Sequence, residues 1–323
     1  MTAPTLEVHL SPDEAVTALR EDARQGLTAA EKWLAPKWFY DARGSDLFED
    51  ITRLPEYYPT RTEKALLRAH AADIARASGA DTLVELGSGS SEKTRLLLDA
   101  LRDAGTLRRY VPQDVSQSAL EVAAHEVAAE YPAIEVHGVV GDFTRHLDEL
   151  PGGDRRLLAF LGGTLGNLIP DERAEFLASV RAVLVPGEHL LLGVGLVTDP
   201  AVLVPAYDDA AGVTAEFNRN VLHVLNRELG ANFEPGAFEH VALWNETDEW
   251  IEMRLRATRA MHVRLDELDL EIDVAAGEEI RTEVSAKFRI EGIATELERA
   301  GLALTSRWTD ADERFALLLA TAV

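Results

Sequence analysis

The chain has 323 residues, of which 46% are hydrophobic, and it contains no cysteine. Its 32 Lys and Arg against 56 Asp and Glu give a formal net charge of −24, and the acids are spread along the chain. Because phosphate binding depends on clustered basic residues, we expect neither nucleic acid nor an anionic membrane as partner, and a small or zwitterionic substrate instead. The lack of cysteine excludes disulfides, thiolate zinc sites and a cysteine nucleophile.

The length allows one large domain or two modest domains with full cores. The first residues include several acids and no apolar run of signal-peptide length. Nothing later approaches the roughly 18 consecutive apolar residues of a membrane span. The expected form is a cytoplasmic monomer.

The N-terminal part begins with a helix signal. The sequence Ser11-Pro12-Asp13-Glu14 is typical of a capped helix start and predicts a helix that ends near Arg24. An aromatic-rich, irregular passage follows over residues 33–60, and most of its rings are expected to seal a core. Three of its residues differ, because a buried phenol needs a hydrogen-bond partner: Tyr40, Tyr57 and Tyr58.

The chain is organised around a short apolar strand, Thr82–Leu86, that stops at a Gly-x-Gly turn and is followed by an amphipathic helix. A second capping box, Thr60-Arg61-Thr62-Glu63, opens the preceding helix. Gly87 can adopt a backbone angle that a side chain would forbid, and Gly89 lets the backbone approach a ligand at the N-terminus of the next helix. The pattern indicates a nucleotide-type ligand, with a purely structural turn as the alternative.

Two acids in this region favour S-adenosylmethionine over a dinucleotide. The third glycine of the dinucleotide fingerprint is replaced by Glu92, whose negative charge suits a pyrophosphate poorly. Glu85 can accept a hydrogen bond from the amino group of a cationic ligand that has no phosphate.

Acids also follow the next two predicted strands. Asp114 ends the strand that begins at Arg109, where it can bind both ribose hydroxyls, although it could also cap the following helix. Asp142 could accept from an adenine amino group while Phe143 covers the ring, with an ordinary turn as the competing interpretation. A fourth strand, 157–161, leads into a glycine-rich loop in which Asn167 offers both a donor and an acceptor.

From Val197 the alternation of strands and helices stops. We expect a loop over residues 199–209, a helix over 214–229 and an antiparallel meander over 239–287. Period-two spacing places Glu283 and Ser285 on one face of a strand, where a solvated face is the plain alternative. A helix over 293–300 and a closing β-hairpin end the chain.

These elements predict an α/β protein with a Rossmann-like class I methyltransferase sheet, made of five alternating βα units and a C-terminal antiparallel hairpin. A dinucleotide dehydrogenase would more often continue with βα units. A second, α+β domain is built from the N-terminal segment and an insertion. The expected boundaries are 1–60 with 197–286 for the substrate-binding domain, and 61–196 with 287–323 for the S-adenosylmethionine-binding domain.

The longer motifs carry a specific resemblance. They are Lys37-Trp38-Phe39-Tyr40-Asp41, Leu54-Pro55-Glu56-Tyr57-Tyr58-Pro59-Thr60, Glu85-Leu86-Gly87-Ser88-Gly89-Ser90 and Gly162-Gly163-Thr164-Leu165-Gly166-Asn167. With these motifs, almost the whole chain resembles the histidine-specific methyltransferases of ergothioneine biosynthesis. The resemblance implies transfer of three methyl groups from S-adenosylmethionine to the α-amino nitrogen of L-histidine, which gives hercynine.

The resemblance also implies roles for individual residues. Tyr57 and Tyr207 would hold the substrate carboxylate, Asn167 the α-amino group, and Glu283 with Ser285 the imidazole. Tyr40 would lie near the reacting nitrogen, so Tyr40 and Asn167 are the catalytic candidates. The positions that match the family's cofactor site are Tyr40, Gly87, Lys93, Asp114, Asp142 and Phe143. No metal is required.

The pocket chemistry separates this function from its alternatives. A carboxylate and a hydroxyl can satisfy both nitrogens of a neutral imidazole, and Met253, a flexible side chain, would set how large a ring fits. A methyltransferase for another aromatic amino acid would more naturally carry an apolar residue at position 283. The remaining alternative is a catalytically silent S-adenosylmethionine sensor.

Overall fold

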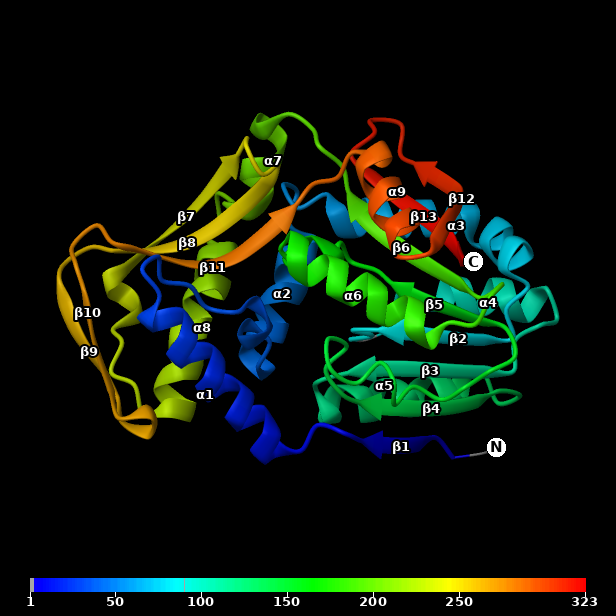
Figure 1. Cartoon of the computed structure of the whole chain (residues 1–323), viewed down its shortest axis with the longest axis horizontal. Helices are drawn as coiled ribbons and strands as arrows, with labels where there is room; N and C mark the ends of the chain where they lie inside the picture. Colours follow the sequence, from blue (N-terminus) through cyan, green and yellow to red (C-terminus); the bar gives the residue numbers. More distant parts are fainter. Residues whose placement is uncertain (1–2, 90) are drawn as a thin grey trace. The chain divides into compact units, whose positions relative to one another are not determined.

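A computed structural model describes residues 3–89 and 91–323 of the chain. The chain divides into two compact units (Figure 1). The first unit contains the described residues up to 11 together with 61–197 and 288–323, and the second contains 12–60 and 198–287. Each unit is therefore assembled from segments that are distant in the sequence.

A mixed sheet forms the centre of the first unit. Its strands lie in the order β1-β4-β3-β2-β5-β6-β13-β12. The strands from β1 to β6 in this order are parallel, and β13 is antiparallel to both β6 and β12. Their bounds are β1 (Thr5–Val8), β2 (Thr82–Leu86), β3 (Arg109–Asp114), β4 (Glu135–Val140), β5 (Arg156–Phe160), β6 (His189–Gly195), β12 (Leu302–Thr309) and β13 (Phe315–Ala322). The predicted Rossmann-like sheet with its C-terminal antiparallel hairpin is confirmed.

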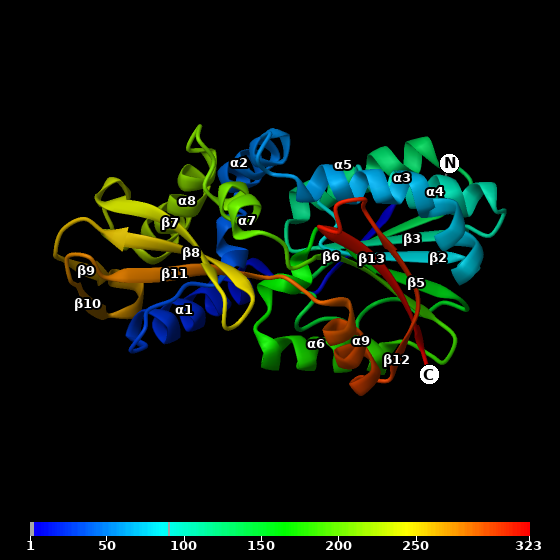
Figure 2. The ribbon, with the colours of Figure 1, turned by 90° about the horizontal axis from the view of Figure 1, so that it is seen from above.

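Helices cover both faces of this sheet (Figure 2). On one face, Ile74, Leu97 and Val127 of three helices are buried in one cluster with strand residues such as Leu83. The helices of that face are α3 (Pro59–Ser78), α4 (Arg95–Asp103) and α5 (Gln117–Glu130), and those of the opposite face are α6 (Pro170–Val183) and α9 (Ile290–Arg299). Residues 141–155, all of them described, join β4 to β5 through turns without a helix.

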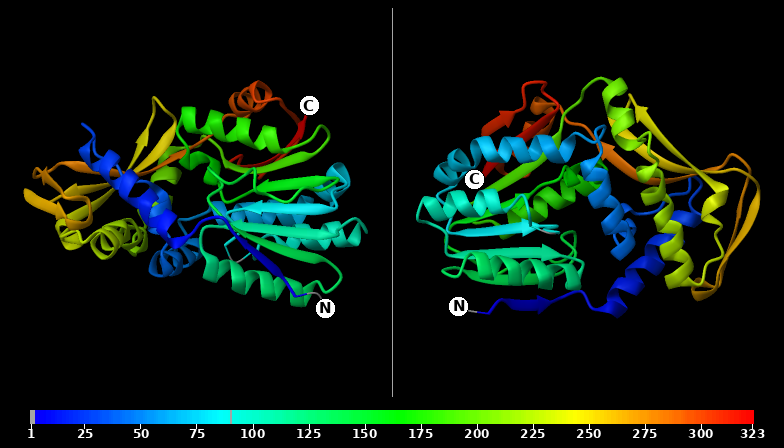
Figure 3. Two further views of the ribbon diagram at one scale, coloured as in Figure 1. Left: turned by 60° about the horizontal axis from the view of Figure 1, so that its bottom comes forward. Right: turned by 180° about the vertical axis from the view of Figure 1, so that it is seen from behind.

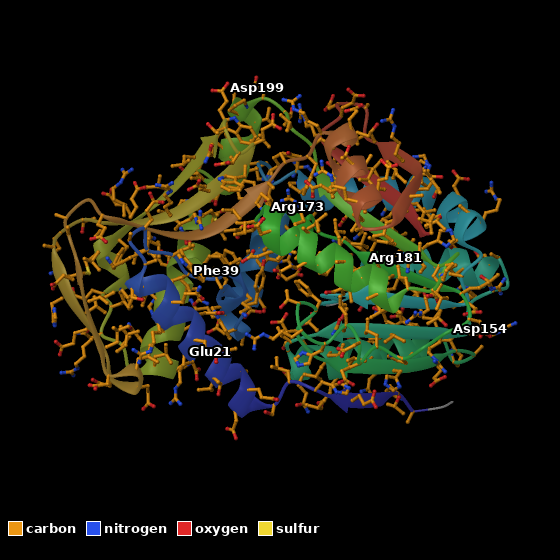
Figure 4. All side chains as sticks on the ribbon, viewed as in Figure 1. Glu21, Phe39, Asp154, Arg173, Arg181 and Asp199 are labelled. Atoms are coloured by element: carbon orange, nitrogen blue, oxygen red, sulfur yellow. The ribbon has the colours of Figure 1, made fainter. Side chains whose placement is uncertain are left out.

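The helices of the second face are tied together by charge. Arg173 of α6, labelled in Figure 4, donates two hydrogen bonds to Glu296 of α9, at 2.7 and 2.9 Å, and its guanidinium lies 5.1 Å from the ring centroid of Phe288. Arg173 is buried and Glu296 is partly exposed, so solvent screens this bidentate pair less than it would a pair on the open surface.

The described residues up to 11 belong to the first unit, not to the second unit as the sequence predicted, whereas residues 12–60 lie in the second unit as expected. Residues Thr5–Val8 form β1, which pairs in parallel with His137–Val140 at the edge of the sheet (Figure 3). This strand is mostly exposed, so it lacks the apolar alternation by which a strand is recognised. The helix that follows begins at Pro12, as predicted, and extends to Thr28.

An antiparallel sheet with the order β11-β8-β7 forms one layer of the second unit, and β9 with β10 forms a separate two-stranded sheet. The strands are antiparallel as predicted, but they are not a simple meander, because β11 pairs with β8. Its core combines Leu19, Phe217, Leu225, Leu255 and Ile280 from helices and strands. The elements are α1 (Pro12–Thr28), α2 (Ala42–Arg53), α7 (Pro200–Tyr207), α8 (Val213–Leu229), β7 (Phe238–Asn245), β8 (Trp250–Ala257), β9 (Met261–Leu265), β10 (Leu270–Val274) and β11 (Glu279–Ala286). Short 3₁₀ helices occur at η1 (Pro36–Phe39), η2 (Thr164–Asn167), η3 (Pro235–Ala237) and η4 (Asp266–Leu268).

Two predicted irregular segments are helical. The expected loop over 199–209 contains α7, because Asp199 (labelled in Figure 4) caps its N-terminus by accepting from the Ala201 amide at 2.8 Å, and Pro200 suits the first helical position. The aromatic passage contains α2, where Asp41 accepts from the Gly44 amide at 2.8 Å. In both cases a capping aspartate stabilises a helix in a segment whose composition suggested irregular structure.

The predicted capping box at Thr60 and Glu63 is wrong. Helix α3 begins at Pro59, and the Glu63 side chain turns into the interior of the first unit, where it is completely buried. There it accepts a hydrogen bond from the Gly162 amide at 2.7 Å and another from the Lys93 ammonium. Among the described helices, none is long and apolar enough to cross a membrane.

The close packing of Glu63 generates a stability prediction. A Cβ added at Gly193 of β6 would lie 1.9 Å from Glu63 Oε1, so Gly193→Ala must displace a buried carboxylate from its two partners. We expect a loss of about 1–3 kcal/mol in the free energy of unfolding, measured by chemical denaturation. Gly152→Ala is the control, since its added Cβ would meet no atom within 4 Å. Equal unfolding midpoints for the two variants would contradict the role of Glu63.

Candidate active site

The predicted ligand loop lies at the carboxyl ends of β2 and β3. The amides of Gly87 and Ser88 donate to the carbonyl of Gln113, at 2.9 and 3.0 Å. Gly87 and Gly89 have φ angles of 66° and 49°, which L side chains rarely adopt. The glycine pattern therefore marks a loop whose backbone folds onto the end of the neighbouring strand. Ser90, in the same loop, lies outside the described residues.

Asp114 ties this loop to the next helix. One carboxylate oxygen accepts from the Gly89 amide at 2.9 Å, and the other accepts from the Ser116 amide at 3.0 Å. Burial raises the pKa of Asp114, while these two hydrogen bonds act in the opposite direction. The carboxylate lies at the end of β3, where the sequence predicted a ribose ligand, but it does not cap the next helix, since the N-cap of α5 is Ser116, whose hydroxyl accepts from the Ala119 amide.

Asp142 and Phe143 follow β4 at the same edge. Asp142 accepts from the amide and the hydroxyl of Thr144, at 2.8 and 2.7 Å, which forms a tight turn. The ring of Phe143 packs with its centroid 4.9 Å from Phe160 and 5.9 Å from Phe176. Phe143 therefore belongs to an aromatic cluster on the face of the sheet that α6 covers.

The glycine-rich loop after β5 is held by the buried Glu63. Gly162 and Gly163 have φ angles of 81° and 74°, and the 3₁₀ helix that ends at Asn167 follows them directly. Because Lys93 is paired with Glu63, its ammonium does not provide a free charge for a phosphate. This pairing agrees with a ligand that has no phosphate.

Glu85 was expected to accept a hydrogen bond from a ligand, but its side chain is buried inside the first unit. Its carboxylate is buried and accepts hydrogen bonds from the hydroxyl of Tyr110, at 2.5 Å, and from the hydroxyl of Thr94. The Tyr110 hydroxyl is in turn 2.8 Å from Ser91 Oγ. Burial raises the pKa of Glu85 to about 7, although both hydroxyl donors act to lower it. The network secures the loop to α4 from inside, and does not present Glu85 to a ligand.

The edge of this sheet fits a nucleoside ligand that carries positive charge. It combines glycine backbone, the acceptors Asp114 and Asp142 and the ring of Phe143. Among the described residues, Ser88 Oγ and Gln113 Oε1 are buried there without a hydrogen-bond partner, as expected for atoms that await a ligand or water. In the same described part of the chain, His, Asp and Glu side chains form no group of three or more that could hold a metal ion.

In the second unit, a β-bulge decides which face of β11 carries the polar pair. Arg281 lies opposite Arg254 of β8, and Glu283 lies opposite the next residue, Met253, so Thr282 is an extra residue. Side chains alternate between faces along a strand, and the extra residue reverses this alternation. Glu283 and Ser285 therefore share the face of Ile280, together with Met253 and Ile251 of β8.

Ser285 is part of a buried polar triad with Tyr207 and Lys287. The Ser285 and Tyr207 hydroxyls are 2.8 Å apart, and Lys287 Nζ donates to both, at 2.7 and 2.9 Å. Burial and the nearby Glu283 carboxylate both raise the pKa of Tyr207, so its phenol is protonated at neutral pH. Lys287 was not among the residues predicted from the sequence, although the period-two spacing from Glu283 through Ser285 could have indicated it.

The remaining candidate rings gather around Phe48. The ring of Tyr40 lies 5.5 Å from Phe48 and 5.4 Å from Phe217, and Tyr40 is 40% exposed. The ring of Tyr57 lies 6.2 Å from Phe48 and also 6.2 Å from Tyr207. A single aromatic cluster therefore extends from the exposed Tyr40 to the buried triad.

Asn218 of α8 connects the bulge to Tyr207. Its Oδ1 accepts from the Thr282 hydroxyl at 2.6 Å, and its Nδ2 lies 2.8 Å from Nδ1 of His240. The other ring nitrogen of His240 is 2.8 Å from the carbonyl of Tyr207, so Nε2 carries the proton and Nδ1 accepts. Burial lowers the pKa of His240, which favours this neutral form.

The predicted residues thus fall into two sets. The first unit carries the cofactor candidates Gly87, Lys93, Asp114, Asp142 and Phe143, together with Asn167. The second unit carries Tyr40, Tyr57, Tyr207, Met253, Glu283 and Ser285.

The strand order, the terminal hairpin and the glycine edge define an S-adenosylmethionine-dependent methyltransferase. Residues 19–322 match the family model described as histidine-specific methyltransferase, SAM-dependent, and the chain belongs to this family.

Named relatives cover nearly the whole chain. It is 60% identical to the histidine N-alpha-methyltransferase of Mycolicibacterium smegmatis over 316 residues, which is 98% of each chain. It is 56% identical to the protein of the same name from Mycobacterium tuberculosis, over 97% of each chain. It is also 33% identical to ergothioneine biosynthesis protein 1 of Neurospora crassa, over 87% of this chain and 32% of that longer protein.

The buried Glu85 generates a pH prediction. Its folded pKa of about 7 lies above the ordinary 4.5, so the folded state binds more protons than the unfolded state between these values. Stability therefore falls as the pH rises from about 4.5 to 7, by about 3 kcal/mol at 1.36 kcal/mol for each tenfold change. Denaturant unfolding at pH 5 to 8 should show that Glu85→Gln removes most of this slope, while the exposed Glu126→Gln keeps it. Parallel slopes for Glu85→Gln and the wild type would refute this account.

The hydrogen bonds of Asn218 generate a second stability prediction. Asn218→Ala leaves the buried His240 Nδ1 without its donor, while the Thr282 hydroxyl keeps the Met253 carbonyl as its acceptor. Since an unsatisfied buried group costs about 1–3 kcal/mol, we expect a loss of about 1–3 kcal/mol in the free energy of unfolding. Gln117→Ala, at an exposed amide of α5, should change it by less than about 0.5 kcal/mol. A loss no larger than that of the control would mean that the network does not hold the bulge.

Proposed function

We propose that this protein transfers three methyl groups from S-adenosylmethionine to the α-amino nitrogen of L-histidine and so forms hercynine for ergothioneine biosynthesis. The observation that carries the proposal is the polar face of β11. A carboxylate, Glu283, and a hydroxyl, Ser285, share this face in an otherwise apolar core. A neutral imidazole has one donor and one acceptor nitrogen, which these two groups can satisfy as a pair.

We assign the remaining substrate contacts by the chemistry of each group. The phenols of Tyr57 and Tyr207 would donate to the substrate carboxylate, and the amide of Asn167 would hold the α-amino group. Met253 lies directly opposite Glu283 in the sheet and is almost fully buried, so its side chain would limit the size of the ring. The cofactor candidates are Tyr40, Gly87, Lys93, Asp114, Asp142 and Phe143, where Lys93 would act through its pairing with Glu63.

The chemical demand on the chain is mainly positioning. S-adenosylmethionine supplies a methyl group on a cationic sulfur that leaves as a neutral thioether. The chain must hold an unprotonated amine in line with that methyl group, and an α-amino group with a pKa of about 8 is partly neutral at neutral pH. Asn167 and Tyr40 would direct the nitrogen lone pair without acting as strong bases.

Repeated transfer also requires a site that tolerates growing positive charge. After each round the amine has gained a methyl group and lost a possible hydrogen bond. The partly exposed ring of Tyr40 could stabilise a methylated ammonium by about 0.5–2 kcal/mol through a cation–π interaction. The neighbouring rings of Phe48 and Phe217 hold Tyr40 in place for this role.

The proposal includes a cytoplasmic monomer that does not bind nucleic acid or membranes. The formal charge of −24 opposes binding to phosphate-rich surfaces, which supports the exclusion of nucleic acid and anionic membranes. Light scattering of the purified protein and fractionation of producing cells would test these two properties.

The direct test is mass spectrometry of the protein incubated with S-adenosylmethionine and the twenty amino acids. We expect histidine to gain three methyl groups while the other amino acids stay unchanged. Methylation of a different aromatic amino acid would keep the cofactor assignment and remove the assignment of Glu283. Cofactor binding without methylation of any amino acid would instead indicate a sensor.

The imidazole assignment predicts the effect of Glu283→Ala. Loss of a charged hydrogen-bond partner should lower kcat/KM for histidine about 10²-fold, because such a bond contributes roughly 1.5–3 kcal/mol, while the Kd of S-adenosylmethionine stays within about twofold. Glu279→Ala is a matched control on the same strand, since Glu279 pairs with Arg254 and Arg256 on the opposite face. Unchanged kinetics for Glu283→Ala would exclude this carboxylate from the substrate site.

A further inference from the structure

Lys287 is a buried cation that the assigned contacts do not use. It follows β11 directly and is 7% exposed. Its ammonium lies 2.7 Å from Ser285 Oγ and 2.9 Å from the Tyr207 hydroxyl, and 4.8 Å from the centroid of the Tyr207 ring. A buried lysine is costly unless it has partners, so its presence beside two proposed substrate contacts calls for a functional account.

The hydrogen bonds of this triad can be counted. An ammonium group donates and cannot accept, so both hydroxyl oxygens accept from Lys287. Ser285 and Tyr207 are 2.8 Å apart, and one hydroxyl proton fills that contact. One hydroxyl proton therefore remains, and it is available to an acceptor outside the triad. A neutral amine could accept that proton instead, and the triad would then offer no hydroxyl proton.

We propose that Lys287 is a positioning residue that, through its ammonium, makes the Ser285–Tyr207 pair present a hydroxyl proton to an acceptor atom of the substrate. The inference rests on the proposed function, in which Ser285 faces an imidazole nitrogen and Tyr207 faces the substrate carboxylate. Both of these substrate atoms are acceptors, so the remaining proton serves one of them, and both are served only when the hydrogen bond between the Ser285 and Tyr207 hydroxyls opens. The positive charge of Lys287 also favours an anionic carboxylate nearby.

The electrostatic surroundings support this arrangement. Burial lowers the pKa of Lys287 to about 7, and the carboxylate of Glu283 on the same strand acts to raise it. Glu283 thus favours the ammonium form that the hydrogen-bond count requires. The buried lysine also lowers the stability of the folded state. A lysine with a lowered pKa makes the folded state less stable than an apolar side chain would.

The test uses Lys287→Met, which keeps the length of the side chain and removes its donors and charge. Calorimetry should show L-histidine binding weakened about 10- to 100-fold, with S-adenosylmethionine binding unchanged within about twofold. The Tm should stay equal or rise, because an internal charge has been removed. Lys32→Met is the matched control: Lys32 is a half-buried lysine of the same unit that pairs with Glu278, so its loss should leave histidine binding unchanged.

A double-mutant cycle separates positioning from general structure. In a Ser285→Ala background, Lys287→Met should weaken histidine binding less than it does alone, because part of its effect passes through the lost hydroxyl. Additive losses, or histidine binding by Lys287→Met within twofold of the wild type, would overturn the inference. A lower Tm with equal weakening of both ligands would also overturn it, since that result describes a structural residue.

Two further results keep the test decisive. If Lys287→Met does not fold, Lys287→Leu is judged by the same criteria, because it also removes the donors and the charge. If the wild type itself does not bind L-histidine, the proposed function fails. A wild type that binds histidine beside an unaffected Lys287→Met removes this inference alone.

Discussion

The proposed substrate site depends on one extra residue in one strand. Without the bulge at Thr282, strict alternation would place Glu283 and Ser285 on the face opposite Ile280. With it, a carboxylate and a hydroxyl lie on the face that also contributes Met253 and Ile251 to the core. A bulge disrupts the local ladder, so it needs other hydrogen bonds to persist. The Thr282 hydroxyl supplies them through Asn218 and the Met253 carbonyl.

The same hydrogen-bond network also fixes the position of Tyr207. Asn218 contacts His240, and His240 donates to the carbonyl of Tyr207, so α8, β7 and α7 are connected to β11 through buried polar groups. Such a network is stable only when its members are satisfied, and a change at one member is felt by the others. The hydroxyl of Tyr207 and the side chains after the bulge are thereby positioned together, before any ligand binds.

Sequence periodicity predicted the regular elements of the first unit closely. The predicted strands 82–86 and 109–114 have the observed bounds, because buried parallel strands show as short apolar runs that end at glycine or aspartate. Sequence periodicity did not predict which residues distant in the chain pair with one another. The pairing of β1 with β4, the turn of Glu63 toward Lys93 and the contact of Lys287 with Tyr207 join residues far apart in the chain, and no local pattern encodes them. Helix α7 was missed for a local reason, since its two prolines conceal the cap at Asp199.

The loops of the first unit follow a common physical rule. Glycines in the left-handed region point their amides away from the regular strand ladder, so these amides need another acceptor, which can be a side chain. Asp114 accepts from Gly89, and Glu63 accepts from Gly162, so each glycine loop is held by a carboxylate from another element. An aspartate or glutamate accepts without donating, which leaves it unsuited to replacement by an apolar residue. The acids near the predicted ligand edge therefore shape the backbone of the loops, and ligand recognition is built upon a backbone that they have already ordered.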